Sequence, residues 1–99
     1  MKLLILRLNF LIMSMNKNSL IHEIKRLIKK DGYMFPNNTI LTLDRYDEYI
    51  PTHLIAMFVK GDVLYITTYT KEYGDEIDKV SDFHTDFVKE FYNILMNNA

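Results

Sequence analysis

The 99-residue sequence predicts a small α+β domain in which two helices pack on one face of an antiparallel sheet. Two strand-like runs flank Gly61-Asp62, and an amphipathic helical segment lies on each side of them. The expected element order is (β)-α-β-β-β-α, with a three-stranded meander and a fourth strand if the N-terminal segment is extended. The length suffices for one core, so we place a single domain at residues 16–99.

Composition and charge limit the class of protein and the kinds of partner that the sequence allows. The chain is 48% hydrophobic with three glycines and two prolines, which is typical of a globular protein. It has no cysteine, which excludes disulfides and thiolate chemistry and favours a cytoplasmic location. Residues 1–30 carry a charge of +6, whereas residues 31–99 carry −7. This split indicates either a surface for an acidic or nucleic-acid partner or mutual attraction of the two halves.

Residues 1–15 are mostly apolar and allow more than one interpretation. They begin like a secretory signal, but Arg7 and Asn9 interrupt the apolar run and no small-residue cleavage site follows. The run is shorter than the roughly 20 residues that span a membrane, so we expect no membrane association. The alternating leucines predict a strand or a packing arm. Alternatively, Met13 or Met15 is the natural start and the residues before it are an upstream extension.

The segment 19–31 predicts the first helix. Asn18 or Ser19 is expected to cap its start, and Gly32 to close its end. Its apolar residues recur at helical spacing, namely Leu20, Ile21, Ile24, Leu27 and Ile28. The opposite face gathers the densest basic cluster in the chain, which consists of His22, Lys25, Arg26, Lys29 and Lys30. This cluster is the candidate nucleic-acid-binding site, although a charged helix face is more often simply solvated.

A β-hairpin is predicted over residues 53–70. Both runs are rich in β-branched and aromatic residues, and Gly61-Asp62 predicts a two-residue turn of type II′. The turn would pair Lys60 with Val63, and this register assigns all other pairs. The expected core face carries Ile55, Met57, Val59, Leu64 and Ile66. The other face is aromatic and amphipathic and carries Leu54, Ala56, Phe58, Tyr65, Thr67 and Tyr69.

The remaining segments predict loops, a short strand and the last helix. We expect a strand at residues 39–43 and loops at 33–38, 44–52 and 71–81, the last two acidic. The final helix should run from Asp82 or Thr85 to Met96, with Ser81 or Asp82 as its cap. Its apolar stripe consists of Phe83, Phe87, Val88, Phe91, Ile94 and Leu95.

No motif of catalytic chemistry is present. His22, His53 and His84 lack metal-ligand spacing, and the acidic loops lack the calcium-binding pattern. There is no nucleophile motif and no glycine-rich phosphate loop, so we expect no enzyme activity, metal or cofactor. The element order is that of double-stranded-RNA-binding domains. However, residues 78–84 are acidic where those domains carry lysines, so we do not extend their function to this chain.

These observations favour a non-enzymatic interaction protein. An open aromatic sheet face beside acidic loops suits a protein interface, because tyrosines bury area at low entropic cost. The candidate protein-binding residues are Leu54, Phe58, Tyr65, Tyr69, Asp75 and Glu76. The expected partner is a protein or a protein–RNA complex. A homodimer through the N-terminal arm or the open sheet face would also occupy this surface.

The residue usage, rich in Asn, Lys, Ile and Tyr, is typical of AT-rich bacterial or phage genomes. By analogy with other small proteins of this kind, it favours an inhibitor or regulator, for example an anti-defence protein of a phage or mobile element. The alternative is an RNA-binding module that uses the basic face of the first helix and stacks bases on exposed tyrosines.

Overall fold

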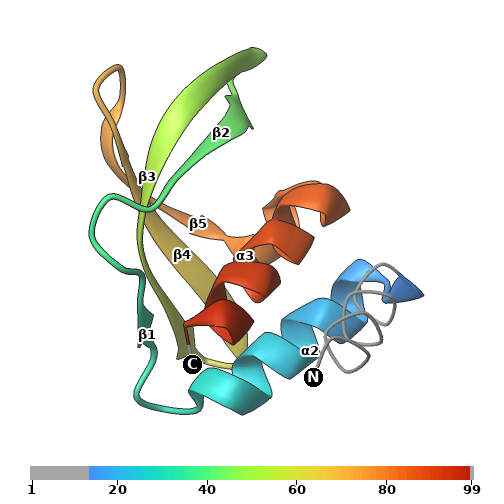
Figure 1. Ribbon diagram of the computed structural model, residues 1–99. Coiled ribbons are helices and arrows are strands. Elements are labelled where there is room, and N and C mark those ends of the chain that lie inside the picture. The colour runs from blue at the N-terminus through green and yellow to red at the C-terminus, as the bar shows by residue number, and fades with distance from the viewer. Residues whose placement is uncertain (1–13, 99) are drawn as a thin grey trace.

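The computed structural model describes residues 14–98 and confirms the α+β class (Figure 1). Within that range, helices α2 and α3 lie on one face of a five-stranded antiparallel sheet. The predicted N-terminal strand or arm, at residues 1–13, lies outside the described range. In chain order the elements are α2 (Lys17–Ile28), β1 (Tyr33–Met34), β2 (Ile40–Arg45), β3 (Glu48–Lys60), β4 (Val63–Thr70), β5 (Gly74–Lys79), the 3₁₀ turn η1 (Val80–Asp82) and α3 (Thr85–Asn97).

Strand β3 is the centre of the sheet. Both β1 and β2 pair with one side of it, β4 pairs with the other side, and β5 pairs with β4. The predicted three-stranded meander was therefore too small, because segments expected to be loops contain β1, β5 and the first part of β3. Residues 44–52 form a hairpin whose turn is Tyr46-Asp47, with φ angles of 52° and 66°.

The β3–β4 turn is of type I′, not the predicted II′. Both of its central residues, Gly61 and Asp62, have positive φ angles, of 55° and 65°. Aspartate tolerates the left-handed region better than most residues, so a Gly-Asp pair can form this turn. The predicted pairing of Lys60 with Val63 is confirmed, because types I′ and II′ leave the same two residues in the loop.

A β-bulge in β3 changes which residues face the helices. Beyond Ala56 the register with β4 shifts by one residue, so Leu54, not Ile55, lies opposite Thr68. In β3, the predicted assignment of side chains to the two faces is therefore correct from Ala56 to Lys60. For Leu54 and Ile55, before the register shift, the two faces are exchanged. Leu54 is buried in the core, whereas Ile55 is 40% exposed, and both side chains were assigned to the wrong face.

Helix α2 starts two residues before its predicted start. Its cap is Asn16, whose Oδ1 accepts a hydrogen bond of 2.8 Å from the Ser19 backbone N–H. Helix α3 is capped by His84, whose Nδ1 accepts from the Asp86 N–H at 3.2 Å, and not by Ser81 or Asp82. The two last-named residues instead belong to η1, which leads from β5 into α3.

One hydrophobic core lies between the helices and the sheet. Its largest fully buried side chain is Phe91, and Leu20, Ile24, Met57 and Ile66 are also completely buried. The Lys17 ammonium donates to the backbone carbonyls of Ser81 and Phe83, which connects the start of α2 to η1 and its C-cap residue. Among the described residues, no helix is both long and apolar enough to cross a membrane.

Gly32 occupies a position that a larger residue would strain. Its φ angle is +72°, and a Cβ atom there would lie 2.9 Å from the Met57 carbonyl oxygen. Gly61 has a similar φ of +55° but open space around the same position, so it serves as the matched control. Gly61→Ala should reduce the free energy of unfolding by about 1 kcal/mol, the cost of left-handed backbone. Gly32→Ala should reduce the free energy of unfolding at least about twice as much, because the Met57 carbonyl of β3 must also move away from the added methyl group.

Urea unfolding of the two variants checks this prediction. Equal losses would show that β3 yields to the added methyl group and that the close approach at Gly32 imposes no constraint.

Tyr33 carries a buried hydroxyl that has no hydrogen-bond partner among the described residues. Burial also raises the pKa of Tyr33. Tyr33→Phe should therefore increase the free energy of unfolding by about 1 kcal/mol at neutral pH, since the unpaired hydroxyl is removed. Because the folded-state pKa lies above the unfolded value of about 10, wild-type stability should fall as the pH rises through 10. Tyr33→Phe should lessen that fall.

The matched control is Tyr49→Phe, because the Tyr49 side chain is 76% exposed. Denaturation at pH 7 and at pH 10.5 should leave the Tyr49 variant close to wild type. A loss of stability in Tyr33→Phe at pH 7 would contradict the prediction and indicate that the hydroxyl makes a favourable interaction.

Candidate interaction surface

The sheet face opposite the helices, here called the outer face, carries Phe58, Tyr65 and Ile77. Side chains alternate across a strand, and paired residues of neighbouring strands point to the same side. Phe58 lies opposite Tyr65, and Thr67 lies opposite both Ala56 and Ile77, so these five residues share one face. Figure 1 shows both helices on the other side of the sheet.

Large apolar side chains on the outer face are exposed. Six of them have an exposed fraction of 40% or more, namely Met34, Ile40, Tyr49, Ile55, Tyr69 and Ile77. Among the described residues, only three other large apolar side chains are exposed, and they lie at turns or on α2. Exposed apolar side chains gathered on one face of a folded domain are typical of interaction sites.

Two aromatic pairs flank the middle of this face. Phe58 and Tyr65 stack across β3 and β4 with ring centroids 5.5 Å apart and an interplanar angle of 21°. His53 and Tyr69 form the second pair, with ring centroids 6.0 Å apart. Beside the first pair lies a groove of about 520 Å³, lined by Phe58, Lys60, Gly61, Val63, Tyr65 and Ile77. The groove can receive an apolar side chain against two aromatic rings.

The charges on the outer face are separated along the strands. On β5, Lys79 lies opposite Tyr65 at the end near the β3–β4 turn, and Asp75 lies opposite Tyr69 at the other end. Both side chains are exposed. Lys60 adds a positive charge at the first end. The face thus has a positive end, an apolar middle and a negative end.

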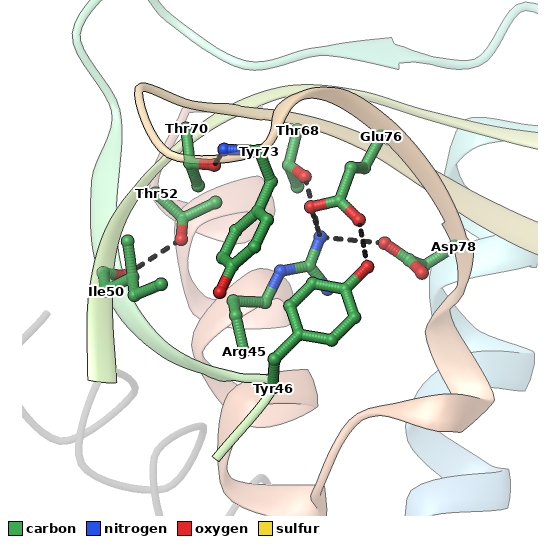
Figure 2. Close-up of polar contacts among 9 residues, drawn as sticks. All are labelled: Arg45, Tyr46, Ile50, Thr52, Thr68, Thr70, Tyr73, Glu76 and Asp78. Atoms are coloured by element: carbon green, nitrogen blue, oxygen red, sulfur yellow. Dashed lines mark hydrogen bonds and ion pairs between the residues drawn. The ribbon is translucent and has the colours of Figure 1, made fainter. Parts of the chain in front are cut away.

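On the helix side of the sheet, Arg45 is almost completely buried in a polar cluster (Figure 2). One guanidinium nitrogen donates to Asp78 at 2.8 Å, to the Thr68 hydroxyl at 3.0 Å and to Glu76 at 3.4 Å. The guanidinium also lies 5.3 Å from the centre of the Phe83 ring. Arg45 therefore connects the end of β2 to β4, β5 and Phe83, the residue that follows η1.

Tyr46 completes this cluster. Its hydroxyl donates to the second carboxylate oxygen of Glu76 at 2.7 Å, and this hydrogen bond raises the pKa of Tyr46. Its ring packs against Tyr73, from the β4–β5 loop, with centroids 4.5 Å apart. The ends of the β2–β3 and β4–β5 hairpins are thus held together by the buried Arg45 guanidinium and by the contact of the Tyr46 and Tyr73 rings, as Figure 2 shows.

A cavity of about 170 Å³ adjoins the Arg45 cluster. It is lined by Asp44, Arg45, Asp78, Asp82, Phe83, His84 and Phe87. Nowhere in residues 14–98 do three or more His, Asp or Glu side chains come close enough to hold a metal ion. The buried guanidinium pairs with Asp78, one of the three aspartates that line this cavity.

The structure separates the candidate protein-binding residues into three groups. Phe58, Tyr65, Tyr69 and Asp75 lie together on the outer face. Leu54 belongs to the core because of the bulge and cannot contact a partner. Glu76 points to the helix side and binds Arg45 and Tyr46.

Sequence reasoning assigned Ile55 to the core face and gave no role to four further exposed residues of the outer face, namely Met34, Ile40, Tyr49 and Ile77. The sequence indicated these four residues only weakly, because three of them lie in segments that were expected to be loops. Ile40 lies in a short predicted strand of mixed periodicity. Only the pairing of those segments with β3 and β4 brings the four side chains onto one surface.

Two residues of the candidate nucleic-acid-binding cluster already have partners within the fold. Arg26 pairs with Glu23 at 2.7 Å, one helical turn earlier. The Lys25 ammonium donates to the Asp62 backbone carbonyl at 2.7 Å, in the β3–β4 turn. His22, Lys29 and Lys30 are exposed, and the two lysines follow the end of α2. Phosphate binding by this face stays a prediction.

No family model, curated protein or solved structure matches the chain.

Loss of the buried cation should be costly. Arg45→Ala would leave the Glu76 and Asp78 carboxylates partly buried without their partner, so we expect a loss of about 3–5 kcal/mol in the free energy of unfolding. Arg26→Ala is the matched control, because it breaks an exposed ion pair whose energy water screens, and its effect should be far smaller. Urea denaturation measures both variants. Similar small losses would show that the Arg45 cluster is solvated and does not hold the hairpins together.

Proposed function

We propose that this protein is a non-enzymatic interaction protein whose contact surface is the outer face. The observation that supports the proposal best is the continuity of exposed apolar side chains over β1 to β5 on a face that the described helices do not cover. Apolar surface gains about 25 cal/mol for each Å² removed from water, so a partner that covers this face would gain substantially.

The chemistry of the face is that of a protein-binding surface. It has an aromatic and aliphatic middle with charged residues at its ends, the distribution found in protein interfaces. Phe58 and Tyr65 would supply the anchors, because rigid rings next to a groove lose little entropy when they are buried. A small inhibitor or regulator that acts by covering a partner's surface would need no catalytic group and would use this face for contact.

RNA binding is the second candidate function and has less support. A phosphate-binding face needs several cations free to meet the backbone, and Lys25 and Arg26 are already engaged within the fold. The outer face also carries Asp75, which would repel phosphates.

A photo-crosslinking residue at position 77 tests the proposed surface in cells. Ile77 is 65% exposed on the outer face, so we expect crosslinks from this position to a protein. Leu27 provides the matched control, because it is an exposed apolar residue on α2, away from the sheet. Position 27 should give little or no product.

Three results would overturn the proposal. The first is equal crosslinking from positions 77 and 27, and the second is a product that disappears on nuclease treatment. The third is a crosslink within the chain to residues 1–13, which would mean that the protein covers its own outer face.

A further inference from the structure

We infer that the partner of the outer face is a second copy of this chain, packed sheet against sheet in a two-fold symmetric dimer. The inference rests on the proposed function, because it names the occupant of the same surface. Such an interface must be complementary to itself, since both subunits contribute the same residues. The charge pattern and the aromatic pattern of the outer face meet this requirement, and a third feature, its size, fits a dimer that dissociates.

The first feature is the charge pattern of β5. Asp75 and Lys79 lie two residues on either side of Ile77, and all three side chains share the outer face. Consider a two-fold axis that lies in the interface, runs across the strands and passes beside Ile77. It would place Lys79 opposite Asp75 of the partner subunit, and Asp75 opposite the partner's Lys79. Each dimer would therefore contain two such ion pairs.

The second feature is the aromatic pattern of β3 and β4. The row that contains Ile77 continues through Thr67 and Ala56, which have small side chains. On one side of this row lie Phe58 and Tyr65, and on the other side lie His53 and Tyr69. The same axis would place each ring pair opposite the other pair of the partner subunit. Small residues at the centre would let the two sheets approach to about 10 Å, the usual distance between packed sheets.

The third feature is the size of the face. From Lys60 to His53, β3 extends over about 26 Å, and four strands side by side span about 19 Å. The projected area is then about 500 Å² for each subunit, which places the dimer near the lower limit of about 1,000 Å² for a specific interface. We therefore expect a dimer that dissociates on dilution, not a permanent one.

Charge also favours this arrangement over one in which the two-fold axis runs along β5. An axis that runs along the strands beside β5 would place Lys79 opposite the partner's Lys79 and Asp75 opposite the partner's Asp75. Like charges in direct opposition disfavour such packing. Of these two axes, the one across the strands converts the charge separation of β5 into attraction.

A charge-reversal cycle on the full chain tests the inference. Sedimentation equilibrium should be measured from about 1 to about 500 µM, the range in which small interfaces dissociate. The wild type should dimerise reversibly. Asp75→Lys and Lys79→Glu should each weaken the dimer at least about tenfold, because each creates like-charge contacts across the interface. The double variant restores opposite charges and should return the dissociation constant to within about threefold of wild type.

Matched controls separate this interface from a general effect of charge. Lys29→Glu and Asp31→Lys make the same changes at exposed positions between α2 and the sheet and should leave dimerisation unchanged. Ile77→Glu should abolish it, because two carboxylates would then meet at the axis. Circular dichroism of each variant verifies that the fold is retained, which these exposed positions permit.

A wild type that stays monomeric over the whole range would overturn the inference. The same holds for a dimer that survives Ile77→Glu, or for a double variant that is not restored. These outcomes are distinct from failure of the proposed function. A crosslink from position 77 to a different protein would retain the outer face as an interaction surface while excluding a second copy as its occupant.

Discussion

The rest of the structure depends on the pairing register of β3. This strand bonds to β1, β2 and β4, so its side-chain directions decide what belongs to the core and what faces outward. The bulge at Ile55 shifts one half of β3 by one residue, which places Leu54 under the helices and Ile55 outside. Without the shift, Leu54 would face water and Ile55 would point toward the helices. The division of the sheet into a core face and an outer face therefore depends on one extra residue.

Arg45 plays the corresponding role at the far end of the sheet. The segment that forms β5 has a low intrinsic preference for strand, since it contains Gly, Asp and Glu. It pairs with β4 nevertheless, and this pairing points Glu76 and Asp78 at the buried guanidinium. Once β5 is in place, Ile77 must face outward, because side chains alternate along a strand. The buried ion cluster and the exposed outer face are thus two sides of the same pairing.

This coupling gives the outer face a rigid geometry. The exposed residues of the face lie on paired strands, and the tips of both hairpins are held by Tyr46, Tyr73 and Arg45. A surface on a stiff sheet loses little conformational entropy when a partner covers it. The opposite charges of Asp75 and Lys79 would contribute to specificity more than to affinity, because exposed ion pairs are individually weak.

The sequence by itself determined both helices, the central hairpin and most of the core. Helical and strand periodicities survive wherever one face of a long element is buried, as in Leu20, Ile24, Phe91 and the pairing of Met57 with Ile66. The sequence also indicated an aromatic sheet face around Phe58 and Tyr65. It could not indicate β1, β5 or the bulge.

Those features were decided only by the tertiary structure. Short or acidic segments gain strand structure from the neighbour with which they pair, and no local preference reports the presence of that neighbour. A buried cation such as Arg45 reveals its role only when the carboxylates of a distant strand surround it, because its energy depends on burial and on distance. Ile77 joins the candidate site for the same reason, since pairing alone brings it to the middle of the outer face.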